Sequence, residues 1–174
     1  MTERDPFSTI EAADIERAAE FVRQVNEDEA RYPESPVKQE TVKDNLEHSE
    51  RVRRNAREIA EGENLDVKLM ELAGLLHDVQ KLDHRDKNSG GIDTWHHHHR
   101  VASLAEKFIL VELKKSAGVA QKIKGMINAH SDIPFIRRYW EANYKDKPPT
   151  PYTKEEVALR DADTIDQLTA HGMQ

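Results

Sequence analysis

Apolar residues recur every three or four positions along most of the chain, and this spacing is typical of amphipathic α-helices. Residues 40–61, for example, carry one apolar face, formed by Val42, Leu46, Val52, Ala56 and Ile59. Similar patterns predict helices over residues 8–30, 40–61, 67–82, 94–109, 116–129, 135–144 and 153–169. No segment alternates apolar and polar residues as a half-buried strand does. We therefore predict an all-α fold, a single-domain bundle of about six to seven helices.

The segment 67–82 is apolar on nearly every side of its helix. Its apolar residues are Leu69, Met70, Leu72, Ala73, Leu75, Leu76 and Val79. A helix without a polar face is usually buried, so we expect it at the centre of the bundle. Two other helices start with a capping box, in which a Ser or Thr precedes a Glu by three positions. These boxes are Ser8–Glu11 and Thr153–Glu156.

Residues 31–36 contain two prolines and interrupt the helical pattern. This break divides the chain into an N-terminal helix with its linker, residues 1–36, and a main domain, residues 37–174. We expect the N-terminal helix to cover the core of the main domain. An alternative role for this helix is dimerisation, and a homodimer is therefore one expected state of the protein.

The composition excludes several classes of protein. The chain has 174 residues, 34% of them charged, and a formal charge of -7, so we expect no large nucleic-acid interface. It has no Cys, which excludes disulfides and zinc sites built on sulfur. No window holds the roughly 18 apolar residues of a membrane span, and the N-terminus lacks a signal-peptide pattern. We therefore expect a cytoplasmic protein. Because the chain is acidic, we expect it to bind phosphate only with the help of a local cation.

Nine His residues are present, and several lie at positions that face the bundle interior. His48 precedes Val52 by one turn, so it points to the buried side of its helix. His77 and Asp78 end the most apolar stretch of the chain, where two ionisable groups are unfavourable unless paired or bound to metal. Ordinary explanations exist: His48 as a core histidine with one hydrogen bond, and the pair as helix-end groups in local hydrogen bonds.

Further candidate ligands lie on the later helices. His130 lies on the apolar face of its helix, and His97 and His98 in the run 96–99 face inward, although a solvated helix start also explains that run. In the last helix, periodicity places Asp161 on the apolar stripe and Asp163 near its edge, with Asp166 further along. Helix bundles build metal sites from such inward-facing side chains. Mixed imidazole and carboxylate ligands suit Mn, Fe, Co, Ni or Zn better than Mg or Ca.

The order of these residues resembles the HD superfamily of metal-dependent phosphohydrolases. The resemblance covers about residues 45–168 and rests on a His helix, on the segment Leu72–Lys81 with its His-Asp pair, and on a late Ala-Asp-x-Ile segment, residues 162–165. It implies a helical bundle of the HD-domain type, with His48, His77, Asp78 and Asp163 as the metal ligands. Asp161, which periodicity favours, stays the second choice for the last ligand.

Some members of that superfamily bind two metal ions with the help of extra His residues. The segment that follows the His run, residues 101–109, is similar to the family helix that follows such a His. This register selects His97, with His98 as the alternative, and His130 resembles the other extra ligand. The resemblance thus implies one or two divalent ions, of Mn, Co, Ni, Fe or Zn, with Mg also allowed.

The resemblance also implies the reaction, the hydrolysis of a phosphate ester by a metal-activated water. The expected substrate is a nucleotide or a related small molecule, cleaved as a phosphomonoester or phosphodiester. Asp78 would both hold the metal and orient the water, and Lys81 and Arg51 would contact the phosphate. For Arg51, a solvated side chain without contact to the phosphate is an equally good interpretation. The alternatives are an HD-fold di-iron oxygenase and a non-catalytic module that senses a nucleotide.

Overall fold

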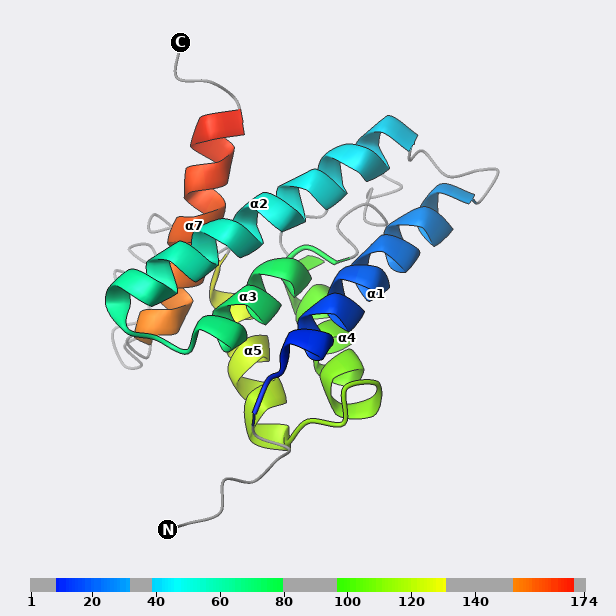
Figure 1. The fold of residues 1–174 in the computed structure, drawn as a ribbon. Helices are drawn as coiled ribbons and strands as arrows, with labels where there is room; N and C mark the ends of the chain where they lie inside the picture. Colours follow the sequence, from blue (N-terminus) through cyan, green and yellow to red (C-terminus); the bar gives the residue numbers. More distant parts are fainter. Residues whose placement is uncertain (1–8, 32–38, 80–96, 131–151, 171–174) are drawn as a thin grey trace, which may run out of the picture.

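The computed structural model describes residues 9–31, 39–79, 97–130 and 152–170 (Figure 1). Over these ranges the chain forms six α-helices and no strand, which confirms the predicted all-α bundle. The helices are α1 (Ala12–Arg31), α2 (Gln39–Glu63), α3 (Val67–Leu76), α4 (His97–Val111), α5 (Ala117–His130) and α7 (Lys154–Ala170). The helix predicted over residues 135–144 lies outside the described residues.

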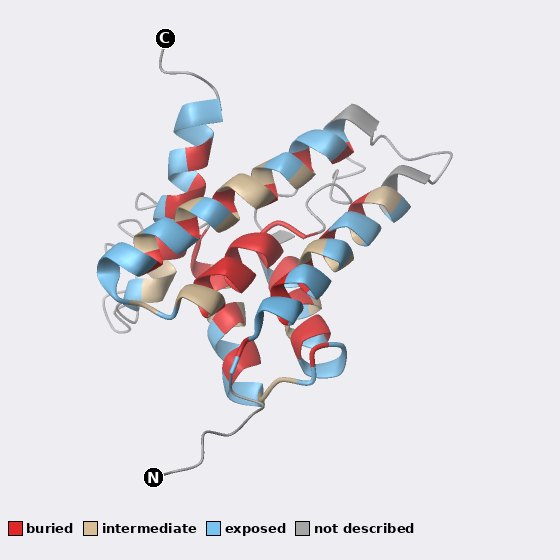
Figure 2. Cartoon of the chain, in the orientation of Figure 1, coloured by how far each residue is buried: buried red, intermediate tan, exposed pale blue. Residues whose placement is uncertain are grey.

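Helix α3 occupies the centre of the bundle, as its apolar sequence predicts. Every residue from Leu69 to Leu76 is buried, and Figure 2 shows α3 enclosed while its neighbours expose their outer faces. The helix packs against α1, α2, α5 and α7. Any side chain at the C-terminal end of α3 therefore lies close to several other helices.

Gly74 allows α3 to approach α2 more closely than any other residue would. A Cβ atom at this position would lie 2.9 Å from Cα and 3.1 Å from N of Arg53, and both of these are backbone atoms. Real Cβ atoms do not approach backbone this closely, so another residue at position 74 would push the two helices apart. His77 follows Gly74 by three residues and His48 precedes Arg53 by five on α2, so this close contact helps to bring the two imidazoles together.

Two helix boundaries differ from the sequence prediction more than the others do. Helix α1 begins at Ala12, later than predicted, and the Glu11 backbone N–H donates a 2.7 Å hydrogen bond to the Asp14 carboxylate. Ser8, the first residue of the capping box predicted here, lies outside the described residues. Helix α3 ends at Leu76 and not at residue 82, because the chain tightens into a turn in which Val79 N–H donates to Leu76 C=O. The predicted capping box of α7 is confirmed, with reciprocal hydrogen bonds between Thr153 and Glu156.

Helix α1 is part of the common core. Its residues Ile15, Ala18 and Val22 are buried in the same apolar cluster as α3. Near its start, the Asp14 carboxylate lies 2.7 Å from the Lys115 ammonium, and both side chains are almost fully buried. This ion pair joins the start of α1 to the turn between α4 and α5.

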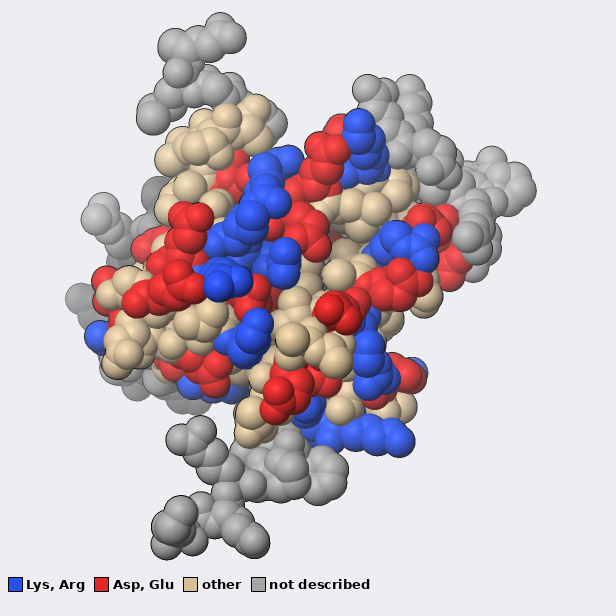
Figure 3. Space-filling view, in the orientation of Figure 1, with Lys and Arg blue, Asp and Glu red and all other residues tan. Residues whose placement is uncertain are grey.

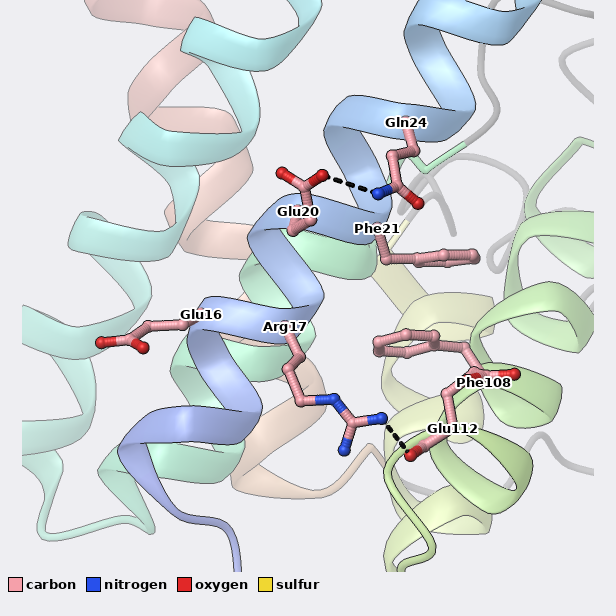
Figure 4. A pocket seen from close by; sticks show the side chains of 7 residues that line it. All are labelled: Glu16, Arg17, Glu20, Phe21, Gln24, Phe108 and Glu112. Atoms are coloured by element: carbon pink, nitrogen blue, oxygen red, sulfur yellow. Dashed lines mark hydrogen bonds between the residues drawn. The ribbon is translucent and has the colours of Figure 1, made fainter.

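A shallow groove runs between α1 and α4 (Figure 4). The rings of Phe21 and Phe108 stack in it with centroids 4.1 Å apart. Beside them, the Arg17 guanidinium donates a 2.5 Å hydrogen bond to the carbonyl of Glu112. These contacts hold α1 against α4.

The surface mixes charges of both signs. Figure 3 shows Lys and Arg side chains gathered over α2 with acidic side chains beside them, and pairs such as Arg53–Glu50 and Arg57–Glu61 lie at 2.9 Å. Exposed pairs of this kind contribute little to stability. Among the described helices, none is long and apolar enough to cross a membrane.

Candidate metal centre

Three His side chains from different elements meet inside the bundle. His48 lies in the middle of α2, His77 follows the last residue of α3, and His130 is the last residue of α5. The His77 ring is in edge-to-face contact with both others, at centroid distances of 5.0 Å from His48 and 5.2 Å from His130. The Nε2 atoms of His48 and His77 lie 3.1 Å apart.

Two carboxylates face the same space. Oδ2 of Asp78 lies 3.4 Å from Nε2 of His48 and 3.4 Å from Nε2 of His77, and its Oδ1 lies 3.8 Å from Nε2 of His130. Oδ1 of Asp163 lies 3.4 Å from Nε2 of His48 and 3.7 Å from Nε2 of His77. We call these five residues, His48, His77, Asp78, His130 and Asp163, the His/Asp cluster.

Hydrogen bonds on the far side of each ring fix the direction of the imidazoles. The Nδ1–H of His77 donates to the Gly74 carbonyl at 2.8 Å, and that of His130 donates to the Ile127 carbonyl at 2.5 Å. Each carbonyl belongs to the residue three positions earlier in the same helix. Because a carbonyl can only accept, Nδ1 carries the proton and Nε2 points into the cluster.

A hydrogen bond between α2 and α7 helps to position Asp163. The Asn55 amide donates to the Ala162 carbonyl at 3.0 Å, next to Asp163 in sequence. One carboxylate oxygen of Asp163 accepts a hydrogen bond from Gln167 at 2.8 Å. The other, Oδ1, is buried and has no hydrogen-bond donor among the described residues. A buried anionic oxygen without a donor is unfavourable unless a cation lies beside it.

The pKa values of His77, His130 and Asp163 are shifted strongly. Burial has the largest effect on His77 and lowers its pKa, but the neighbouring carboxylates of Asp78 and Asp163 together raise it to about 10. Burial and the neighbouring His77 lower the pKa of His130 to about 4. Burial raises the pKa of Asp163, and interaction with His77 outweighs this and lowers it to about 2. The carboxylates thus favour positive charge at this largely buried point.

The two candidate aspartates of α7 lie on different faces of the helix. Asp163 is buried in the cluster, whereas the side chain of Asp161 is 53% exposed and lies 3.6 Å from Arg160. The periodicity argument that favoured Asp161 was wrong, because two of the apolar residues that defined its stripe, Ile165 and Leu168, are exposed. The buried stripe of α7 is instead formed by Ala158, Leu159, Ala162, Asp163 and Asp166.

The structure describes only some of the other residues predicted to bind a second metal or the substrate. His130 lies in the same cluster as the four expected ligands. His97 and His98 belong to the first turn of α4, but their side chains are outside the described part, as is all of Lys81. The Arg51 guanidinium is engaged with Asp166, through Nε at 2.5 Å and Nη2 at 3.2 Å.

Sequence reasoning assigned no role to Asp166, which contacts the cluster directly. Its Oδ2 accepts a 2.7 Å hydrogen bond from Nδ1–H of His48, and its side chain is only 2% exposed. The signal that could have found it is its spacing. It follows Asp163 by three positions and therefore lies on the same face of α7, one turn along.

The residues of the cluster fit a divalent metal ion. Two ligand atoms that each lie about 2.1 Å from one ion are about 3.0 Å apart at a right angle and about 3.4 Å at the tetrahedral angle. The closest nitrogen and oxygen atoms here are 3.1–3.4 Å apart, and two triplets, His48-His77-Asp78 and His77-His130-Asp163, hold their atoms within 4.8 Å of one another. Imidazole and carboxylate donors suit first-row transition metals.

Fold and site together define an all-α protein whose buried His/Asp cluster is compatible with divalent metal. Residues 45–168, well over half of the chain, match the family model of the HD domain. The chain belongs to the HD domain family, which consists mostly of metal-dependent hydrolases, and the resemblance found in the sequence is thereby confirmed. Comparison with curated proteins and with solved structures gave no significant match.

Proposed function

We propose that the protein is a metal-dependent phosphohydrolase that cleaves a phosphate ester of a nucleotide or a related small molecule. The observation that carries the proposal is the convergence of three imidazoles and two carboxylates from four elements at one buried point. A donor set with two buried carboxylates attracts positive charge, and a divalent cation supplies it. Membership of the HD domain family supports hydrolysis as the chemistry.

His48, His77, Asp78 and Asp163 would hold one ion, and His130 would help to hold a second. A divalent transition metal supplies a water acidified toward neutral pH and a polarised phosphoryl oxygen. Asp78 is the residue that we assign to orienting the water. Its two oxygens face different imidazoles, Oδ2 toward His48 and His77 and Oδ1 toward His130. Asp78 thus belongs to the first triplet and also faces a His of the second.

The proposal is tested by assaying hydrolysis of a panel of nucleoside monophosphates, cyclic nucleotides and simple phosphoesters with Mn, Co, Ni, Zn or Mg. We expect wild-type activity with at least one transition metal. His77→Ala and Asp78→Ala should lower kcat by at least 100-fold, because each removes a ligand or the residue that orients the water. Activity retained in both variants would contradict the proposal.

Helix α7 provides a matched pair of variants, one outside the cluster and one inside it. Asp161→Ala removes an exposed carboxylate two residues from Asp163 and should leave activity unchanged, whereas Asp163→Ala should abolish it. Measuring iron content and oxygen consumption of the purified protein separates hydrolysis from the di-iron oxygenase alternative. Substrate-dependent oxygen uptake without phosphate release would replace the proposed reaction with oxidation.

A further inference from the structure

Beyond the cluster itself, a chain of charged side chains leads from His48 to the protein surface. His48 uses Nε2 toward the cluster and donates its Nδ1–H to Oδ2 of Asp166 at 2.7 Å. Asp166 in turn accepts two hydrogen bonds from the guanidinium of Arg51, on both carboxylate oxygens. The Asp166 side chain is nearly fully buried, and that of Arg51 is about one-third exposed.

The three residues come from two helices, so these hydrogen bonds form only when α2 and α7 are correctly aligned. His48 and Arg51 are three positions apart on α2, hence on one face, and Asp166 reaches them from α7, 118 residues later in sequence. His48 differs in this respect from the other two imidazoles. The Nδ1–H groups of His77 and His130 donate to backbone carbonyls, while that of His48 donates to an ionised side chain.

A carboxylate behind a metal-binding imidazole has two physical effects. It fixes the tautomer, so that Nε2 keeps its lone pair for the ion, and it makes the ring a stronger donor. A carboxylate held by a guanidinium fork also keeps a defined orientation, because two parallel hydrogen bonds define its plane. The backbone carbonyls behind His77 and His130 orient those rings without a full negative charge.

From this arrangement we infer that Asp166 is a positioning residue for the metal centre, held in place by Arg51 and acting through His48. The inference rests on the proposed metal site and adds to it a role for two residues outside the ligand set. It also gives Arg51 a role other than contact with the substrate phosphate. Asp166 and Arg51 thus set the affinity of the centre without touching the ion.

The test measures metal affinity directly, by calorimetric titration of the full chain with Mn²⁺ and Zn²⁺. Asp166→Ala should weaken binding by about 10- to 100-fold, the usual effect of losing such a partner. Asp166→Asn keeps an acceptor oxygen for Nδ1–H of His48 but loses the charge, so it should bind with intermediate affinity. Asp161→Asn, on the exposed face of the same helix, should bind as the wild type does.

Arg51 is tested with its own control on α2. Arg51→Met should weaken metal binding several-fold, whereas Arg54→Met, at an exposed position of the same helix, should not. A rise in KM for Arg51→Met with unchanged metal affinity would overturn the positioning role of Arg51. It would support direct contact of Arg51 with the substrate phosphate instead.

A spectroscopic signal separates positioning from general loss of structure. In protein with ¹⁵N-labelled His, the Nδ1–H of His48 should give a protected proton signal that Asp166→Asn retains and Asp166→Ala loses. Melting in the presence of chelator checks that each variant folds. If wild type binds metal and both Asp166 variants bind it equally well, the inference is overturned while the proposed function stands. If wild type binds neither ion, both are overturned.

Discussion

At the scale of single residues, His77 controls how the centre responds to pH. Its pKa of about 10 means that it carries a proton at neutral pH in metal-free protein, while a metal ligand has to be deprotonated. Metal binding at pH 7 should therefore release a proton. Metal affinity should rise about tenfold per pH unit up to the pKa of His77, because raising the pH removes the competing proton.

Titration calorimetry with Zn²⁺ at pH 7, in two buffers of different ionisation enthalpy, measures the proton release. An apparent binding enthalpy that does not depend on the buffer would contradict this prediction. Stability of the metal-free protein should change in the opposite direction. A raised His pKa stabilises the fold below the unfolded value of about 6.5, and this contribution is lost as the pH rises toward 10.

His130 acts in the opposite sense at acid pH. Its pKa of about 4 lies below the unfolded value, so the unfolded chain takes up a proton that the folded protein excludes. The contribution of His130 to stability is present above pH 6.5 and is lost as the pH falls through 4. Between them, the two imidazoles place the stability maximum of the metal-free protein near pH 6 to 7.

The individual ligands could be predicted from the sequence only in part. His48 and the His77-Asp78 pair stand out because ionisable groups interrupt apolar faces. The choice between Asp161 and Asp163 needed the family resemblance, since the exposed Ile165 and Leu168 shift the apparent apolar stripe of α7. Exposed apolar residues are common on protein surfaces, and hydrophobicity alone therefore misplaces a stripe by one or two positions.

At the scale of the helices, the α2–α3 contact sets the geometry of the centre. Gly74→Ala places a Cβ atom 2.9 Å from backbone of Arg53 and should destabilise the protein by about 1–3 kcal/mol, because backbone cannot move aside as a flexible side chain can. It should also weaken metal binding, since His48 and His77 come from the two helices that this contact holds together. Urea unfolding and Zn²⁺ titration measure the two effects.

Gly62 provides the matched control. It also lies in a helix, α2, but an added Cβ atom there would meet nothing within 4 Å. Gly62→Ala should therefore stabilise the protein by about 0.5–1 kcal/mol, the difference in helix propensity. Equal destabilisation by both substitutions would show that the close approach at Gly74 is not what matters.

Helix existence was easier to predict than helix ends. The six described helices each correspond to a predicted segment, because their apolar periodicity extends over several turns. The end of α3 at Leu76 could not be predicted, since Val79 continues the apolar pattern into the turn and is itself buried. Residues 77–79 are buried because the surrounding helices enclose the turn, not because the helix continues.

At the scale of the whole molecule, the centre ties together segments that are distant in sequence. Its residues come from α2, the turn after α3, the end of α5 and α7. Periodicity gives the buried face of each helix but not the neighbour against which that face packs. For this reason the contact of His48 with Asp166, across 118 residues, could not be predicted, although both residues were visible as polar interruptions of helical segments.

The same arrangement predicts that metal binding stabilises the entire fold. An ion that binds the assembled cluster and not the unfolded chain adds about 2.7 kcal/mol at a concentration 100 times its Kd. For a chain of this size that corresponds to a rise in Tm of roughly 5–10 °C. Differential scanning calorimetry should show one transition that moves up with Zn²⁺ or Mn²⁺ and back with chelator, because the ligands join four elements of a single core. Asp163→Ala should lose most of this rise and Asp161→Ala none of it; a rise of equal size in both variants would place the stabilising ion somewhere other than the His/Asp cluster.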